Sequence, residues 1–336
     1  MKLRHLALVA TLVAASAGAL AQDVRDRVIK FGHLVQPGHP IALGTEKFAE
    51  LVASKSGGKM KVREYGASVL GSETQQVGAL QGGVQEMFAP ATTSVASLVK
   101  EMSLIDTPFS FSNAKQVDAL LQGPFGQAML KKLEDKGLVG LDYWETGFRN
   151  VTNSRKPVTT PEDVKGLKIR VMGNPLFLES FSALGTNPVP MAFGELYGAL
   201  ESHALDAQEN PYSIVLTSKF YEVQKYMSVT NHVYTANPVL VSKKFWDRLS
   251  PAEQKILRDA VREAGAYHRA LSREAAEKDR KALLAKGMQI NDVPKETIAR
   301  MREITKPVAD KFAATYDPAL VELYRAEMKK IHETVH

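Results

Sequence analysis

The longest stretch without a helix break runs over residues 250–287 and constrains the fold more than any other feature. Ser250 and Glu253 fit a capping box with a proline between them, and the next strong break is Gly287. If Gly265 is tolerated, roughly 36 residues at about 1.5 Å each give a helix about 54 Å long. The apolar positions do not follow a heptad, which argues against a coiled coil. Because this length exceeds the width of one domain, we expect a helix that runs along two lobes and joins them.

Strand-like and helix-like patterns alternate along the first third of the chain. Strand patterns cover residues 28–35, 59–65 and 84–89, and the segments between them have helical periodicity. This βαβ order favours a mostly parallel sheet with helices on both faces. Further strands are predicted over residues 138–144, 148–154 and 167–172.

The first 21 residues have the pattern of a secretory signal. Lys2 and Arg4 precede an apolar stretch over residues 6–15, and small residues ending at Ala21 precede a predicted cleavage site before Gln22. No later run reaches about 18 apolar residues, so stable insertion in a membrane is not expected. Removal of the signal leaves 315 of the 336 residues, more than one hydrophobic core usually supports, which favours two lobes in an exported protein.

Composition removes several classes of function. The sequence contains no cysteine, which excludes disulfides, thiolate nucleophiles and cysteine-bound metal clusters. It also lacks the HExxH, P-loop, GxSxG and GxGxxG patterns, so we expect neither a metal nor a cofactor. The net charge of +6 falls to +4 without the signal, and the basic residues are scattered among acidic ones. This distribution argues against a nucleic-acid partner and is compatible with an anionic small molecule.

The segment GLKIRVMGNP, residues 166–175, predicts a short strand with one buried face. Leu167, Ile169 and Val171 alternate onto one side, which leaves Arg170 on the other side near the carboxyl end of the strand. In open α/β sheets ligands bind beside the carboxyl ends of strands, and a guanidinium matches a carboxylate with two parallel hydrogen bonds. Arg170 is therefore a candidate anion-binding residue. A surface salt bridge, or one between two elements, is the alternative.

Two further segments place polar side chains at predicted strand ends. Arg149 and Asn150 lie on a strand that follows the aromatic and glycine-containing stretch YWETG. Asn210 is held extended by Pro211 and can offer its amide to a ligand. Two arginines and one amide from three strand ends of one lobe favour a carboxylate-binding site over separate salt bridges.

Three segments, in this order and spacing, resemble the substrate-binding proteins of tripartite ATP-independent periplasmic (TRAP) transporters, the DctP family: GLKIRVMGNP, NPVPMAFGELYGALES and DAQENPYSIVLTSKFYEVQKYMSVTNH. The resemblance covers essentially the whole chain after the signal. It implies an α/β fold of two lobes that close over a ligand, a class II-like periplasmic binding protein, with a long helix across both lobes. We therefore expect a periplasmic receptor of a Gram-negative cell that delivers a small organic acid anion to TRAP membrane permease subunits.

The expected lobes are discontinuous in sequence. Lobe I is predicted to comprise residues 22–146 and 236–275, and lobe II residues 147–235 and 276–336. Hinges are expected near Gly147 and near the Asn237-Pro238 pair, with the ligand in the cleft between the lobes.

The resemblance also implies roles for individual residues. Arg170 corresponds to the arginine that forms a two-pronged salt bridge with the ligand carboxylate in this family, and Asn210 to the asparagine that supports the same carboxylate. Arg149 corresponds to an arginine that many relatives carry, and Phe193 to an aromatic residue that packs over the ligand.

Four further residues are candidates for the wall of the same site. His33 would face the cleft if its strand runs as in relatives, and a polar loop is the alternative. Glu73 opens a predicted helix and could bond a ligand or serve only the helix start. Trp144 lies just before a predicted glycine hinge, where core packing is the alternative. Asn150 lies on the strand that follows this hinge.

The resemblance leaves the ligand open between a sugar acid such as a hexuronate and a C4-dicarboxylate. Phe88-Ala89-Pro90 lacks the glutamate that sialic-acid-binding relatives carry there, which argues against sialic acid. A binding protein for an ATP-driven importer or for a sensor kinase would use the same capture chemistry. A secreted lyase or hydrolase with Glu209 as general base is the enzymatic alternative.

Overall fold

The computed structural model describes residues 24–336, so the predicted signal over residues 1–21 lies outside the described residues. The described strands form one nine-stranded sheet in the order β2-β1-β3-β8-β4-β7-β5-β6, with β9 paired to β8. The strands are β1 (Arg27–Gly32), β2 (Met60–Tyr65), β3 (Met87–Phe88), β4 (Leu138–Asn153), β5 (Lys168–Val171), β6 (Asn187–Pro190), β7 (Ala207–Asn210), β8 (Tyr226–Ser242) and β9 (Gln289–Asp292).

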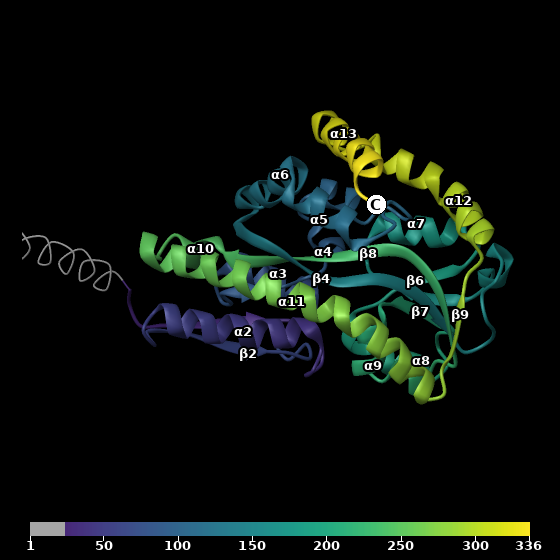
Figure 1. The fold of residues 1–336 in the computed structure, drawn as a ribbon, viewed down its shortest axis with the longest axis horizontal. Helices are drawn as coiled ribbons and strands as arrows, with labels where there is room; N and C mark the ends of the chain where they lie inside the picture. The colour runs from purple at the N-terminus through teal and green to yellow at the C-terminus, as the bar shows by residue number, and fades with distance from the viewer. Residues whose placement is uncertain (1–23) are drawn as a thin grey trace, which may run out of the picture.

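Helices cover both faces of this sheet (Figure 1). The α-helices are α2 (Pro40–Lys55), α3 (Glu73–Gly82), α4 (Thr92–Val95), α5 (Ala114–Gln122), α6 (Pro124–Lys132), α7 (Pro175–Ala183), α8 (Leu196–Glu201), α9 (Tyr212–Thr217), α10 (Lys243–Trp246), α11 (Pro251–Ala285), α12 (Lys295–Ala313) and α13 (Pro318–Thr334). Short 3₁₀ turns lie between them, namely η1 (Lys100–Leu104), η2 (Glu134–Lys136), η3 (Pro161–Val164), η4 (Phe193–Glu195) and η5 (Phe220–Glu222). In residues 24–336, no helix combines the length and the apolar character needed to cross a membrane.

The sheet has a parallel half in each of two lobes, as the sequence predicted. In lobe I, β1 pairs in parallel with β2 and with β3. In lobe II, β5 pairs in parallel with β6 and with β7. Each half therefore presents the carboxyl ends of its parallel strands along one edge, which is where ligands bind in open α/β sheets.

Two long antiparallel strands, β4 and β8, connect the two halves. Their pairing begins at Leu138 with Ser242 and ends at Asn153 with Tyr226, so each strand crosses from one lobe to the other. The patterns over residues 138–144 and 148–154 predicted two separate strands in place of β4, and this was wrong. The strand continues because Gly147 adopts a φ of +101° at a bulge, a conformation that glycine adopts without steric strain.

The long helix predicted from the sequence is α11, and it spans both lobes (Figure 1). Ser250 caps it through a capping box with Glu253, as predicted. The helix packs against α2 in lobe I, against the crossing strand β4 and against α9 in lobe II. A Cβ atom at Gly265 would lie 2.5 Å from a carboxylate oxygen of Asp142 and 3.1 Å from the indole nitrogen of Trp144. This glycine therefore allows the helix to approach β4 closely.

The last two helices pack on different lobes. Helix α12 packs on α7 of lobe II, where Lys311 pairs with Glu179 at 2.6 Å. Helix α13 packs on α5 and α6 of lobe I, where the carboxylate of Glu327 accepts a hydrogen bond from the backbone N–H of Phe125 at 3.2 Å. The predicted assignment of all of residues 276–336 to lobe II is therefore wrong for α13, because the apolar face of this helix is buried against lobe I.

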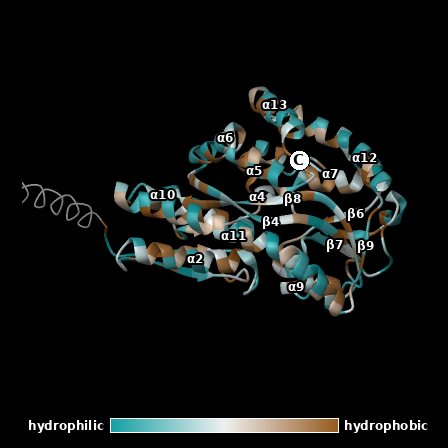
Figure 2. Cartoon of the chain, viewed as in Figure 1, coloured by the Kyte–Doolittle hydropathy of each residue, from teal (hydrophilic) through white to brown (hydrophobic). Residues whose placement is uncertain are grey.

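Hydrophobic residues concentrate along the sheet and on the inner faces of the helices (Figure 2). One core cluster lies between α2, α11 and the sheet, and it includes Phe31, Phe48 and Trp144. A second cluster joins α5, α6 and α13, and a third fills lobe II around Ile169 and Phe177. The first cluster also includes Leu200 and Val215 of lobe II, so it continues from one lobe to the other.

Candidate ligand-binding site

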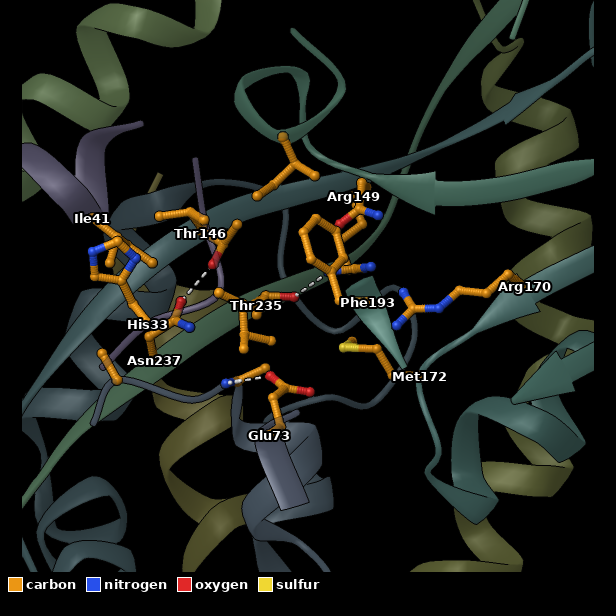
Figure 3. Close-up of a pocket in the computed structure, with 16 residues that line it drawn as sticks. His33, Ile41, Glu73, Thr146, Arg149, Arg170, Met172, Phe193, Thr235 and Asn237 are labelled. Carbon is orange, nitrogen blue, oxygen red and sulfur yellow. Dashed lines mark hydrogen bonds between the residues drawn. The ribbon is translucent and has the colours of Figure 1, made fainter. Parts of the chain in front are cut away.

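A cavity lies between the lobes where β4 and β8 cross (Figure 3). Its wall includes residues that follow β1 and open α3 in lobe I, and residues of β5, β7 and η4 in lobe II. Six of the eight residues that the sequence analysis proposed line this cavity: Arg170, Arg149, Asn210, Phe193, His33 and Glu73. Trp144 and Asn150 are not among the lining residues.

Arg170 lies on β5 and points into the cavity from one side (Figure 3). The residue is only 3% exposed, and its Nε and Nη2 donate to the carbonyl oxygen of Met191 at 3.0 and 2.8 Å. Burial lowers the pKa of Arg170 to about 10; Arg149 acts in the same direction, and Glu209 and Glu73 oppose it. Within the described residues no carboxylate forms an ion pair with Arg170. At neutral pH the site therefore contains a buried cation without a counter-ion, which favours the binding of an anion.

Arg149 lies on β4 and has an internal counter-ion. Its guanidinium forms a buried ion pair with Glu209, in which Nη2 lies 2.8 Å from Oε1 and Nε contacts Oε2. Nη1 also donates to the hydroxyl of Thr235 at 3.2 Å, and His232 Nε2 lies 3.0 Å from Glu209 Oε2. Burial alone would raise the pKa of Glu209, but the charge of Arg149 and the bonds from His232 and Arg149 lower it to about 2. Glu209 is therefore ionised at neutral pH and neutralises Arg149.

The asparagines of the neighbouring strands β7 and β4 have different roles. Asn210 ends β7 opposite Asn150 of β4, lines the cavity and donates from Nδ2 to Gln208 Oε1 at 2.6 Å. Asn150 is fully buried, and its Oδ1 accepts a hydrogen bond from the backbone N–H of Asn231 at 3.0 Å. Asn150 thus holds the irregular segment of β8 at Asn231, whereas Asn210 adjoins the cavity.

Apolar side chains form another part of the wall. Phe193 lies in η4 over the cavity, and its ring meets that of Phe220 edge to face with centroids 6.0 Å apart. Met172 and Ile214 line the cavity nearby. Such a surface suits the carbon skeleton of a small ligand, while the polar groups fix its orientation.

His33 and Glu73 form the lobe I side of the cavity (Figure 3). His33 Nε2 lies 2.8 Å from Glu64 Oε1, and His33 Nδ1 is buried without a hydrogen-bond partner in the described chain. The carboxylate of Glu73 accepts bonds from the backbone N–H of Ala91 at 3.3 Å and from the hydroxyl of Ser94 at 2.5 Å. Both side chains are therefore held in place and retain capacity for further hydrogen bonds.

Three polar lining residues were not proposed from the sequence: Thr146, Thr235 and Asn237. They lie on the crossing strands, and the hydroxyl of Thr146 donates to Asn237 Oδ1 at 2.6 Å. The sequence indicated only a hinge in this region. The β-bulge between Glu145 and Gly147 turns the Thr146 side chain toward the cavity, and one chain alone gives no signal for that irregularity.

Trp144 belongs to the core of lobe I. It is 1% exposed, it stacks on His268 of α11 with ring centroids 5.2 Å apart, and it packs against Phe31 at 5.8 Å. The core-packing alternative for Trp144 is therefore the observed one. The sequence could not separate the two, because an aromatic residue beside a hinge suits either environment.

The arrangement is suited to binding rather than to catalysis. Glu209 was the candidate general base, yet its carboxylate is held in an ion pair with Arg149 and bonded to His232, and its lowered pKa makes it a poor proton acceptor. In residues 24–336, no group of three or more His, Asp or Glu side chains could hold a metal ion.

The two lobes, the long spanning helix and the interlobe cavity with its uncompensated arginine define a bacterial solute-binding protein. Residues 31–315 match the family model described as bacterial extracellular solute-binding protein, family 7, named DctP. The chain belongs to this family, whose members are transport receptors. The resemblance to TRAP substrate-binding proteins predicted from the sequence is thereby confirmed.

Three relatives show the range of ligands within the family. The chain is 37% identical to the 2,3-diketo-L-gulonate-binding periplasmic protein YiaO of Escherichia coli, over 83% of this chain and 84% of YiaO. It is 35% identical to the C4-dicarboxylate-binding periplasmic protein DctP of Rhodobacter capsulatus, over 90% of each chain. It also resembles the crystal structure of the sugar acid binding protein DctPAm of Advenella mimigardefordensis in complex with galactonate. That comparison gives a TM-score of 0.90 and 40% identity, and it covers 92% of this chain and all of the other.

Proposed function

We propose that this chain is a periplasmic receptor that captures a small organic acid between its lobes and delivers it to the membrane subunits of a TRAP transporter. The observation that carries the proposal is Arg170, a buried cation at the cavity wall without a carboxylate partner in the described residues. The neighbouring Arg149 is already neutralised by Glu209. A ligand carboxylate would supply the charge that Arg170 lacks.

The geometry of Arg170 suits a two-pronged contact. Its Nε and one hydrogen of Nη2 are used by the carbonyl of Met191, which leaves Nη1 and the second hydrogen of Nη2. These two donors are parallel and match the two oxygens of a carboxylate. Asn210, at the adjacent strand end, would support the same carboxylate, and Phe193 would cover the carbon chain.

The ligands named for the relatives support this proposal. A diketo-gulonate, a C4-dicarboxylate and galactonate differ in length and in hydroxyl groups, and a carboxylate is their common feature. An ATP-driven importer or a sensor kinase could use the same capture chemistry, but family membership favours delivery to TRAP membrane subunits. An enzymatic role would need a free base, and Glu209 is held in an ion pair.

Calorimetric titration of the purified protein with a library of carboxylic acids tests the proposal. For the acid that binds, Arg170→Ala should lower the affinity by a factor of roughly a hundred to several thousand, because a desolvated anion loses its partner. Arg170→Lys should recover part of the loss, since an ammonium keeps the charge but cannot match two oxygens in one plane. Arg155→Ala is the matched control, because Arg155 pairs with Asp206 on the exposed surface of lobe II.

Two outcomes would contradict the proposal. Failure of every acid in the library to bind would remove the receptor function. Wild-type affinity in folded Arg170→Ala would exclude Arg170 from the site and leave Arg149 as the anchor. Delivery is tested separately by measuring uptake of the bound acid into vesicles that contain TRAP membrane subunits, with and without the receptor. No stimulation of uptake by the receptor would contradict the TRAP assignment.

A further inference from the structure

The charges around the cavity are unequally distributed. Arg170 and Arg149 contribute two positive charges to the wall, and Glu73 contributes one negative charge. Because Glu209 neutralises Arg149 within the protein, Arg170 is left as the one cation of this wall without an internal partner among the described residues. The cavity therefore has one place for a ligand carboxylate.

A second carboxylate would meet an unfavourable environment. Glu73 lies on the wall at the start of α3, opposite the strands of lobe II (Figure 3). Its carboxylate lines the same cavity as Arg170, from the other lobe. In a closed cleft of low dielectric, two carboxylates without a cation between them repel strongly. A ligand with a second carboxylate would place that group toward Glu73 and the neutral groups of lobe I.

The same groups suit hydroxyls. The carboxylate of Glu73 uses one bond at each oxygen, to Ala91 and to Ser94, and each oxygen can accept one more. His33 Nδ1 is buried without a partner in the described chain, although its ring is fixed by Glu64. Hydroxyl groups can donate to Glu73 and either donate to or accept from an imidazole nitrogen.

The crossing strands add neutral groups to this wall. The hydroxyl of Thr146 donates to Asn237 Oδ1 at 2.6 Å, so its oxygen can still accept and the Asn237 amide nitrogen can still donate. The hydroxyl of Thr235 accepts a hydrogen bond from Arg149 Nη1 at 3.2 Å, and it can still donate to a ligand or accept a second bond. Beyond Arg170, the wall thus presents acceptors and donors without a second free positive charge.

We propose that the ligand is a polyhydroxylated monocarboxylate, with its single carboxylate on Arg170 and a hydroxyl donated to Glu73. Glu73 selects against dicarboxylates by charge and for sugar acids by hydrogen bonding. The inference rests on the proposed function, because it assigns a ligand class to the same receptor site.

Four linear six-carbon acids separate charge from hydroxylation. D-Galactonate carries one carboxylate and hydroxyls, galactarate two carboxylates and hydroxyls, hexanoate one carboxylate alone, and adipate two carboxylates alone. Titration calorimetry at pH 7.5 should rank galactonate above the other three by at least about tenfold. D-Galacturonate and D-erythronate extend the test to a cyclic and a shorter monocarboxylate, and succinate extends it to a C4-dicarboxylate.

The variant Glu73→Gln tests the residue that carries the selection. The amide keeps the shape and one acceptor oxygen, so galactarate should bind at least about tenfold more tightly to the variant than to the wild type. The hydroxylated monocarboxylate should bind about three- to tenfold more weakly, because an amide oxygen accepts less strongly than a carboxylate. Glu195→Gln is the control, since Glu195 is exposed in η4 and does not line the cavity. It should leave both affinities unchanged.

The inference is overturned if galactarate, adipate or succinate binds the wild type more tightly than every hydroxylated monocarboxylate, or if hexanoate equals them. It is also overturned if none of the seven acids binds, or if Glu73→Gln leaves the ratio of galactonate to galactarate affinity unchanged. Arg170→Ala separates failure of this inference from failure of the proposed function. If a dicarboxylate binds the wild type and loses its binding in Arg170→Ala, the receptor function stands and only the proposed ligand class is wrong.

Discussion

Arg149 of β4 and Glu209 of β7 form a buried ion pair at the cavity, with each carboxylate oxygen in contact with the guanidinium. The side chains are 3% and 0% exposed. Arg170 is buried to the same degree but bonds only a backbone carbonyl. The two arginines of the site thus have different roles: Arg149 stabilises the folded cavity, and Arg170 is available to bind an anion.

Removing the partner of Arg149 should destabilise the protein. We expect Glu209→Gln to lower the free energy of unfolding by about 3–5 kcal/mol, because it leaves a buried cation uncompensated. Urea denaturation without ligand measures this value. Arg170→Ala should lower it by much less, since no ion pair is broken. Equal losses of stability in the two variants would contradict this division of tasks.

Asp106 should make stability fall as the pH rises toward 7. Its Oδ1 accepts a bond from Thr92 at 2.5 Å, and its Oδ2 has no partner among the described residues. Burial raises the pKa of Asp106 to about 7, although Thr92, Thr93 and Arg149 oppose the shift. The folded protein therefore holds this proton above the pH at which the unfolded chain releases it, so stability decreases between about pH 4 and pH 7.

The variant Asp106→Asn replaces the titratable carboxyl group by a neutral amide and tests the prediction. One pKa unit corresponds to about 1.4 kcal/mol, so ionisation of Asp106 should destabilise the wild type by about 4 kcal/mol. The variant should gain stability relative to the wild type from pH 5.5 to pH 8, as measured by urea unfolding at each pH. Glu209, whose pKa is lowered to about 2, acts in the opposite sense: its stabilisation is complete above about pH 4.5 and is lost as the pH falls toward 2. A constant difference between Asp106→Asn and wild type over this range would show that Asp106 does not titrate there.

Features that follow from local patterns could be predicted from the sequence. The period-two alternation around Arg170 is a property of a few neighbouring residues, and it placed this side chain opposite the apolar face of β5; in the structure Arg170 lines the cavity. The capping box at Ser250 likewise predicted the start of α11 and hence a helix that spans both lobes. The family resemblance added Arg149, Asn210 and Phe193, which also line the cavity.

Features that depend on contacts between distant segments could not be predicted. The sequence left Trp144 open between the cavity wall and the core. Its environment is set by stacking on His268, more than a hundred residues away, which the local sequence does not reveal. Glu209 was a candidate general base from the sequence, but in the structure it forms an ion pair with Arg149. The packing of α13 on lobe I follows from tertiary burial of its apolar face, which its own periodicity does not direct to either lobe.

Gly147 should be required for the crossing of β4 between the lobes. Its φ of +101° lies where side chains with a Cβ are strained, although a Cβ would meet no atom within 4 Å. We expect Gly147→Ala to destabilise the protein by about 1–3 kcal/mol through the backbone alone. Gly198→Ala is the control, because Gly198 lies in α8 with equally open space and helical backbone, where alanine should be neutral or stabilising. Equal effects in the two variants would exclude a backbone requirement at Gly147.

A buried hydrogen bond joins the lobes beside the cavity. His39 caps α2 in lobe I, and Ser213 lies on α9 in lobe II, with His39 Nε2 and Ser213 Oγ 3.1 Å apart. The backbone N–H of Ile41 donates to His39 Nδ1 at 3.1 Å, so the proton of the neutral ring lies on Nε2 and is donated to Ser213. Burial, His268 and His33 hold the pKa of His39 well below its usual value, which keeps the ring neutral.

Ser213→Ala should therefore weaken ligand binding without touching the ligand's carboxylate anchor. Loss of one hydrogen bond across the lobes destabilises the closed form by about 0.5–1.5 kcal/mol, and the affinity should fall about two- to tenfold. Titration calorimetry measures this loss, and small-angle scattering should show a larger radius of gyration for the variant at subsaturating ligand. Ser218→Ala is the matched control, because Ser218 follows the same helix and its buried Oγ has no hydrogen-bond partner in the described chain. If the two serine variants bind alike, the contact between His39 and Ser213 does not contribute to closure.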